Sequence, residues 1–361
     1  MNLRKSLKSL VLLLILITIF SVVGCTQKPV DDVNENNKAD LVENPTEDEV
    51  IVESKDIVIV DHLGREVTFE EPVETIVSGY YISSSILLAL DLQDKIIGIE
   101  AKPEKRPIYE IAAPELLDLP TVGTMKEFDL EGTAALNPDL VILSVRLKDI
   151  AESLEKLGIK VIAINPESME ELEEALIMIG KATGTEERAK ALKEYYGNKL
   201  EELNEIWEGK EKKNIYLGGN SDYLSTASKK MYQDTLINNA GGNNVAAAID
   251  DTYWATISYE QLIQYNPDVI IGAAGAAYTA DDIKNDDKLQ SIKAVENGQV
   301  YIIPSAFELW DSPIPSGIIG TMWLTSVLHE EDYPFEKFKA DTYDFYKEFY
   351  GIEIDKEKIT K

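Results

Sequence analysis

Aromatic and basic side chains gather in the segments that follow the predicted strands of this chain. In α/β proteins such segments meet at the carboxyl edge of a parallel sheet, where ligands bind. Guanidinium groups hold oxyanions through paired hydrogen bonds, and tyrosine and tryptophan rings provide flat walls. The chemistry that these residues support is the reversible binding of an anion. The candidate ligand-binding residues are Tyr80, Tyr81, Arg106, Lys126, Arg146, Tyr223, Tyr278 and Trp310.

The charge of the whole chain makes this basic set unusual. The formal net charge is −30, which argues against nucleic acid and anionic lipid as partners, since both are negative. Basic residues nevertheless recur in the loops of the first half, where a local cluster can bind an anion at short range. They are Lys102, Lys105, Arg106, Lys126 and Arg146.

Enzyme motifs are missing from the sequence. It has no Gly-x-Ser-x-Gly elbow, no His-Glu-x-x-His, no P-loop and no Gly-x-Gly-x-x-Gly, so it is not predicted to be an enzyme. The two histidines, His62 and His329, lie outside the cleft loops and do not suit haem ligation. Tyrosine ligation of haem stays open. No cofactor and no protein-held metal are predicted.

One unit occurs twice. Glu131 is followed by six residues, Pro-Asp and an aliphatic run, and Glu260 begins the same pattern 129 positions later. Each unit predicts a short helix that stops at Asn-Pro, a tight turn and a buried strand. Two copies indicate two lobes of similar construction, with a cleft between them that can hold a ligand.

The amino-terminal segment is typical of a bacterial lipoprotein. A basic stub and a short apolar run precede Gly24 and Cys25, the only cysteine of the chain. Residues 1–24 are therefore predicted to be a signal peptide, with Cys25 as the lipidated residue. Residues 25–55 are acidic and contain no aromatic side chain, which predicts a disordered tether. The alternative is an uncleaved anchor helix.

The rest of the chain predicts an α/β architecture. A hairpin over residues 57–69 precedes strands at 75–77, 96–99, 140–144 and 161–164, with helices between them, so residues 56–167 form a first lobe with a parallel sheet. Helical spacing of apolar residues predicts one long linking helix over 168–208, with Gly184 as a candidate kink. Strands at 215–217, 269–271 and 300–303 and a helical end from 317 to 350 assign residues 209–361 to a second lobe.

Several of these stretches together resemble a known family. The chain resembles the solute-binding lipoproteins of ABC importers for iron complexes (siderophore or haem) and cobalamin, the class III periplasmic binding proteins with a helical backbone. The resemblance covers roughly residues 57–304. It rests on the two Glu units and on Asp61-His62-Leu63-Gly64-Arg65-Glu66-Val67, Thr75-Ile76-Val77 and Val122-Gly123.

The resemblance implies a fold, a role and partners. The fold is two Rossmann-like α/β lobes joined by a single long backbone helix, with the ligand cleft between them. Glu131 and Glu260 would dock into arginine pockets of a permease dimer that works with ATPase subunits. The protein would be an extracytoplasmic, lipid-anchored monomer that captures a siderophore-type iron complex. Molybdate or tungstate, and haem or cobalamin, are alternative ligands, and a surface adhesin or scaffold is a distant alternative.

Overall fold

A two-stranded hairpin begins the part of the chain that the computed structural model describes, residues 56–361. Strands β1 (Ile57–Val60) and β2 (Glu66–Phe69) pair antiparallel, as the sequence predicts. The Asp61 carboxylate closes the connection by accepting the backbone N–H groups of Leu63 and Arg65, at 2.9 and 3.0 Å. The predicted signal peptide, Cys25 and the acidic tether lie outside the described residues.

The first lobe contains a four-stranded parallel sheet in the order β4-β3-β5-β6. Aliphatic residues fill its strands, which are β3 (Ile76–Ser78), β4 (Ile96–Gly98), β5 (Leu140–Ser144) and β6 (Lys160–Ile164). Every residue of β3 and β5 is buried, as expected for a sheet that is covered on both faces. The helices of this lobe are α1 (Tyr81–Ala89), α2 (Pro107–Ala112), α3 (Leu130–Ala135) and α4 (Lys148–Lys156).

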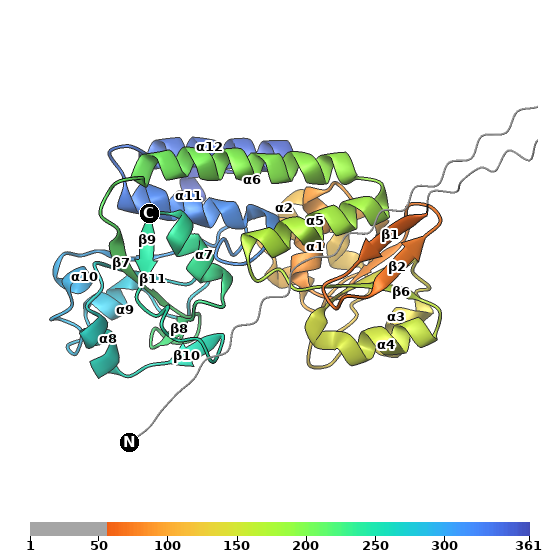
Figure 1. The fold of residues 1–361 in the computed structure, drawn as a ribbon, viewed down its shortest axis with the longest axis horizontal. Helices are drawn as coiled ribbons and strands as arrows, with labels where there is room; N and C mark the ends of the chain where they lie inside the picture. The colour runs from red at the N-terminus through yellow and green to blue at the C-terminus, as the bar shows by residue number, and fades with distance from the viewer. Residues whose placement is uncertain (1–55) are drawn as a thin grey trace, which may run out of the picture. The chain divides into compact units, whose positions relative to one another are not determined.

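The predicted helix over 168–208 is two helices, α5 (Met169–Thr183) and α6 (Glu186–Trp207). Gly184 ends α5 in the left-handed conformation, with φ of 77°, so the chain turns there instead of merely kinking. A side chain at Gly180 would come within 2.8 Å of the Ala189 Cβ, which shows how closely α5 and α6 pack. Helix α5 therefore belongs to the first lobe, and α6 alone links the lobes (Figure 1).

The second lobe is built on a mixed sheet in the order β10-β8-β7-β11-β12, with β9 paired to β7. Strands β7 (Lys213–Gly218), β11 (Val269–Gly272) and β12 (Val300–Ile302) are parallel and match the prediction. Three short strands were not predicted: β8 (Ser225–Ala227), β9 (Gly242–Asn244) and β10 (Trp254–Thr256). The small helices are α7 (Tyr232–Asn239), α8 (Tyr259–Tyr265), α9 (Ala280–Lys284) and α10 (Lys293–Glu296).

Two helices follow at the carboxy-terminal end, α11 (Ile318–Leu328) and α12 (Phe335–Phe349). Together with the linking helix α6 they form one layer of helices. Figure 1 shows α12 running alongside α6, and the Tyr195 ring packs on Phe345 and Phe349. Arg188, at the start of α6, donates to the carbonyl oxygens of Ala89 in the first lobe and of Phe349 in α12. In residues 56–361, no helix has the length and apolar character needed to cross a membrane.

The repeated unit folds the same way in both lobes. Helices α3 and α8 carry Glu131 and Glu260 in their first turns, and Asn137 and Asn266 then adopt left-handed conformations with φ of 48° and 42°. Strands β5 and β11 follow two residues after each proline. The predicted fold class, two α/β lobes joined by a helix, is confirmed.

Candidate ligand-binding site

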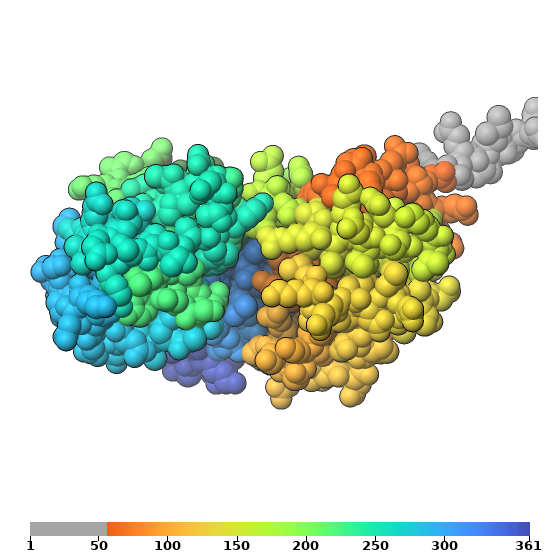
Figure 2. All heavy atoms as spheres, turned by 90° about the horizontal axis from the view of Figure 1, so that it is seen from below, coloured from red at the N-terminus to blue at the C-terminus, as the bar shows by residue number. Residues whose placement is uncertain are grey.

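A cavity of about 270 Å³ lies at the carboxyl edge of the first-lobe sheet and reaches the second lobe at Pro313. A furrow separates the two lobes on the face opposite α6 (Figure 2). The walls of the cavity come from the loops that follow β3, β4, β5 and β6, which is the edge where an α/β sheet offers free backbone and side chains. Four predicted residues line it: Tyr80, Tyr81, Arg106 and Arg146.

The turn between β3 and α1 directs two tyrosines into this cavity. Tyr80 has extended backbone geometry and precedes the first residue of α1, Tyr81. Their rings meet edge to face, with centroids 6.4 Å apart. Burial raises the pKa of Tyr80 well above its usual range and that of Tyr81 to about 12, although Ser312 and Arg106 oppose the shift at Tyr81. Both phenols are neutral at physiological pH and offer O–H donors.

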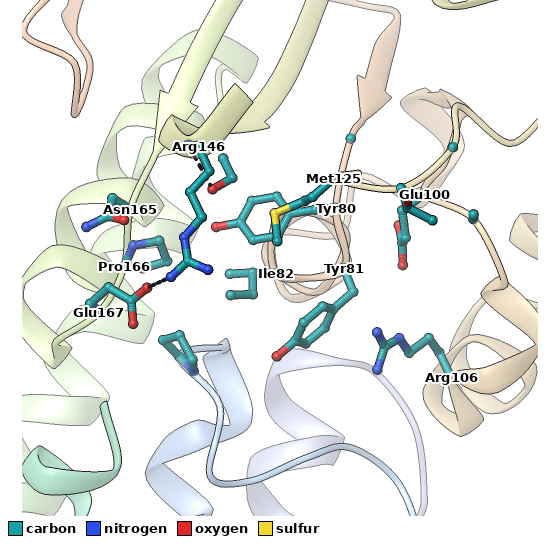
Figure 3. Close-up of a pocket in the computed structure, with 16 residues that line it drawn as sticks. Tyr80, Tyr81, Ile82, Glu100, Arg106, Met125, Arg146, Asn165, Pro166 and Glu167 are labelled. Carbon is teal, nitrogen blue, oxygen red and sulfur yellow. Dashed lines mark hydrogen bonds and ion pairs between the residues drawn. The ribbon is translucent and has the colours of Figure 1, made fainter. Parts of the chain in front are cut away.

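Arg106 lies over the face of Tyr81, with its guanidinium carbon 4.1 Å from the ring centre. The residue comes just before Pro107, the first residue of α2, so its backbone is extended and its side chain leaves the helix toward the cavity. Such stacking orients the planar guanidinium and leaves its edge N–H groups available to an anion. Figure 3 shows this pair on the side of the cavity away from Arg146.

Arg146 lies on the other side and is already partly neutralised. Its Nη2 atom is 3.2 Å from Oε1 of Glu167, and the Tyr253 ring of the second lobe approaches to 5.5 Å. Burial raises the pKa of Glu167, an effect that Arg146 opposes. Neither Glu167 nor Tyr253 was among the predicted residues. Glu167 follows β6 and could have been found by extending the strand-end rule to acidic residues, whereas no sequence signal marked Tyr253.

A buried carboxyl, Glu100, forms part of the cavity wall and was also missed. It accepts hydrogen bonds from the Ser84 hydroxyl at 2.6 Å and from the Tyr109 hydroxyl at 2.7 Å. Burial raises its pKa, and the two hydroxyl donors hold the rise in check. Both carboxyl oxygens are thus occupied by protein donors. Glu100 therefore fixes the positions of α1 and α2 beside the cavity, which makes it a positioning residue.

Four predicted ligand-binding residues do not line this cavity. Lys126 is exposed on the loop whose neighbours Thr124 and Met125 do line it. Tyr223 and Tyr278 pack edge to face at 5.4 Å in the second lobe, and the Tyr223 hydroxyl donates to Asp286. Trp310 is fully buried and donates its indole N–H to Tyr346 at 2.9 Å. Their roles in ligand binding stay predictions, and the placements show that an aromatic residue in a loop can pack inward as readily as toward a ligand.

The predicted docking glutamates lie at equivalent exposed places. Glu131 follows the N-cap Asp129, which accepts from the Gly132 N–H group, and Glu260 follows the N-cap Ser258, which accepts from that of Gln261. A carboxylate in the first helical turn complements the helix dipole. The backbone N–H of Glu260 and the Ser258 hydroxyl lower the pKa of the Glu260 carboxyl, so it carries full negative charge at neutral pH.

Neither histidine reaches the cavity. His62 accepts the backbone N–H of Asn165 at Nδ1, and its Nε2 lies 3.3 Å from Glu174. Burial lowers the pKa of His329, near the end of α11. Within residues 56–361, no three His, Cys, Asp or Glu side chains are grouped to hold a metal ion. The described site is suited to binding a preformed anion through donors and aromatic faces.

Comparison with known proteins shows which family the chain is similar to. The family described as periplasmic binding protein matches residues 76–307, well over half of the chain. The molybdate-binding protein MolA of Haemophilus influenzae is 23% identical over 320 residues, 82% of this chain and 91% of its own. The ABC transporter substrate-binding lipoprotein YvrC of Bacillus subtilis is 26% identical, over 68% of this chain and 77% of its own.

Two further similarities were found, one to a curated protein and one to a solved structure. The Fe(3+)-citrate-binding protein YfmC of Bacillus subtilis is 28% identical over 245 residues, 65% of this chain and 77% of its own. A solved periplasmic solute-binding protein from Veillonella parvula superposes with a TM-score of 0.72 at 24% identity, over 83% of this chain and 94% of its own. This structural match shows that the two-lobe fold is shared.

Proposed function

Because the chain belongs to the periplasmic binding protein family, we propose that it captures an anionic, siderophore-type iron complex outside the cytoplasm. Membership in this family makes it the substrate-binding component of an ABC importer, and it confirms that the chain is not an enzyme. The permease and its ATPase subunits are therefore its partners. The identity of the solute, the lipid anchor at Cys25 and the monomeric state are parts of the proposal.

The pairing of Arg106 with Tyr81 carries the proposal. A guanidinium held flat against a tyrosine offers directed N–H donors to an anion, and the neutral phenols add O–H donors beside it. Arg146 provides a second cation on the opposite side, with Glu167 as its partner when no anion contacts it. An anionic complex that spans both guanidinium groups would gain two charge-assisted contacts.

A small oxyanion is the second candidate. MolA, which is named for molybdate binding, aligns with most of this chain, so molybdate or tungstate must be tested. The positions of Arg106 and Arg146 on opposite sides of the cavity favour a larger anion, because one tetrahedral oxyanion cannot easily contact both (Figure 3). Haem and cobalamin are the remaining alternatives from the sequence. A role as adhesin or scaffold would not require a cavity lined by arginine and tyrosine side chains.

Titration of the purified protein tests these candidates directly. We would measure quenching of its intrinsic fluorescence with ferric siderophores of several chelate types, ferric citrate, haem, cobalamin, molybdate and tungstate, and check stoichiometry by native mass spectrometry. Submicromolar binding of one ferric chelate, with the others weak, is the expected result. Selective binding of molybdate or tungstate would reject the iron complex in favour of an oxyanion.

A further inference from the structure

A second cavity of about 220 Å³ adjoins the first, and both lobes contribute to its wall. The two cavities share Tyr81 and Arg106, so they meet at this stacked pair. An apolar protein cavity of about 150 Å³ can hold one benzene molecule, so the second cavity has room for a group of about six carbon atoms. We call it the side chamber, and its apolar lining residues are Pro107, Ile108, Phe307, Leu309 and Ile314.

Apolar surface is accessible from both sides of the side chamber. Leu309, in the loop that follows β12 of the second lobe, is only half-buried, and its side chain lies beside Gly275. Pro107, the first residue of α2 in the first lobe, is exposed. The other apolar lining residues are almost fully buried, so they support the wall from within. A hydrocarbon group in the side chamber would therefore be contacted by both lobes.

The acidic residue of the wall, Glu308, presents no charge to the side chamber. Its Oε1 atom is buried, and its Oε2 atom accepts from the Tyr346 hydroxyl at 3.2 Å. Burial raises the pKa of Glu308, although nearby hydroxyls oppose the rise, so the neutral form gains relative to an exposed glutamate. Among the described residues that line the side chamber, no other is acidic. A solute in the side chamber therefore meets no accessible carboxylate.

The accessible charges of the side chamber are positive. Lys105 and Arg106 both line it, and neither forms an ion pair within residues 56–361. By contrast, Arg146 of the first cavity is already paired with Glu167. The Arg106 guanidinium is held against the Tyr81 ring, which leaves its edge N–H groups available to an anion. An anionic group that carries a hydrocarbon chain would thus find a positive charge and an apolar wall side by side.

We propose that the side chamber binds a hydrocarbon arm of the solute, with the arm against Leu309 and Pro107 and an anionic group at its root beside Arg106. This inference rests on the proposed function and refines it. The solute is then an amphiphilic chelate, which is anionic at its metal-binding end and extended by an uncharged alkyl group of about six carbon atoms. Both parts of the solute contact the stacked pair of Tyr81 and Arg106, because that pair lines both cavities.

Straight-chain carboxylates test the side chamber without any metal complex. Saturation-transfer NMR on the purified full-length protein should detect hexanoate, and the affinity should rise about fourfold for each methylene group from butanoate to hexanoate. Hexylammonium, which has the opposite charge, and 1-hexanol, which has none, should bind about tenfold more weakly than hexanoate. No binding of hexanoate, equal binding of hexylammonium, or an affinity that does not depend on chain length would overturn the proposal.

Three variants locate the bound hexanoate. Leu309→Asn puts a polar amide of similar size on the accessible wall and should weaken hexanoate binding about fivefold or more. Leu157→Asn makes the same exchange at an exposed position that lines neither cavity, so it should bind hexanoate like the wild type. Arg106→Gln should reduce the preference for hexanoate over 1-hexanol, which gives an independent result if circular dichroism shows that Leu309→Asn is unfolded. Equal hexanoate affinities in Leu309→Asn and Leu157→Asn would show that hexanoate binds elsewhere.

The second test compares pairs of anionic ferric chelates that differ only in a hexyl substituent. The hexyl chelate should bind the wild type about tenfold more tightly than its unsubstituted partner, and Leu309→Asn should reduce this difference. Equal affinities in the wild type would refute the role of the side chamber in solute selection. If no ferric chelate binds while hexanoate still binds in a way that depends on Leu309, the iron-complex function fails and the hydrocarbon site stands. If unsubstituted chelates bind and hexanoate does not, the iron-complex function stands and the hydrocarbon site fails.

Discussion

The stack of Arg106 on Tyr81 places one cation in the wall of the cavity, with its guanidinium held against the ring. We expect Arg106→Ala to weaken binding of the cognate anion by roughly 10- to 100-fold, the usual loss for a charge-assisted hydrogen bond. Arg106→Lys should recover only part of this loss, because lysine lacks the planar fork. Equilibrium titration of each variant measures these differences.

Lys126 provides the matched control for that experiment. It is a cation of the same lobe that the structure leaves exposed and outside the cavity wall. Lys126→Ala should therefore bind the solute like the wild type. A loss in Lys126→Ala equal to that in Arg106→Ala would mean that general electrostatic attraction, and not the stacked geometry, determines affinity.

Asp61 ties the hairpin to the first-lobe sheet and should control acid stability. Its side chain is fully buried, and burial alone would raise its pKa, but Arg65 and the N–H group of Ala163 outweigh this effect and lower the pKa. Its contribution to the free energy of unfolding is thus present above the unfolded pKa of about 3.9 and is lost as pH falls through the lower folded value.

We expect Asp61→Asn to destabilise the protein by about 1–3 kcal/mol at neutral pH. Its free energy of unfolding should also fall less steeply below about pH 4 than that of the wild type. Urea unfolding followed by circular dichroism between acid and neutral pH measures both effects. Asp118→Asn removes the same charge from an exposed position, so it should change neither the free energy of unfolding at neutral pH nor its dependence on pH. If the two variants behave alike, the hydrogen bonds of Asp61 do not contribute to stability.

The Pro-Asp part of the repeated unit has a structural explanation at the scale of elements. Asp139 accepts from the N–H and hydroxyl of Thr75, just before β3, and Asp268 accepts from the N–H of Asn214 in β7. Each aspartate thus joins the starts of two neighbouring parallel strands, β5 and β3 in the first lobe and β11 and β7 in the second. The repetition in the sequence reflects this shared strand pairing as well as the position of the glutamate.

The strands that the sequence could predict are those with continuous aliphatic runs. Strand β5 was predicted to the residue because Leu140–Ser144 is a buried run bounded by Pro-Asp. In contrast, β9 consists of Gly242, Asn243 and Asn244, which have no strand preference of their own, so it exists because β7 offers a free edge. Pairing of this kind depends on tertiary structure.

The candidate site shows the same limit. Tyr80, Tyr81 and Arg146 were predictable because they directly follow strands, and strand ends determine the edge of the sheet at which a residue lies. The depth of a side chain in its loop was not predictable. Trp310 is buried against Phe307 and Tyr346, and Tyr253 reaches Arg146 only because the two lobes face each other. Contacts between lobes leave no periodic signal in the sequence.

Gly184 determines where the linking helix begins. With φ of 77°, and with the Pro72 side chain 3.3 Å from where a Cβ would lie, Gly184→Ala should destabilise the protein by about 1 kcal/mol. Gly197 is within α6 and has open space around it, so Gly197→Ala should stabilise by about 0.5–1 kcal/mol. Thermal and urea unfolding distinguish these opposite signs. Destabilisation by both would show that α6 does not tolerate added side chains.

At the scale of the whole described fold, α6 and α12 limit how far the lobes can move. Arg188 bonds to both lobes, and Lys199 pairs with Asp341 across the two helices at 3.1 Å. We expect solute binding to close the cleft only slightly, so small-angle scattering should show little change in the radius of gyration. Compaction on the scale of hinge-type receptors would contradict a stiff α6. Arg188→Ala should increase the change in the radius of gyration on binding, because it removes the hydrogen bonds from α6 to both lobes.

We propose that the permease recognises both lobes together through one glutamate on each. Glu131 and Glu260 occupy the first turns of equivalent helices, exposed on separate lobes, so each can accept an arginine fork from one permease subunit. Glu131→Gln and Glu260→Gln together should reduce solute uptake by cells more than tenfold, while the affinity of the purified protein for solute stays unchanged. Each single variant should have an intermediate effect, because one lobe remains docked.

Asp149→Asn is the control for docking, since Asp149 is an exposed acid in the first turn of α4. It alters charge and helix-end chemistry as the glutamine variants do, but it lies outside the repeated unit. Uptake should be normal in this variant. If uptake survives loss of both glutamates, or falls equally in Asp149→Asn, then the negative charge of the whole surface, and not two matched carboxylates, brings the protein to its permease.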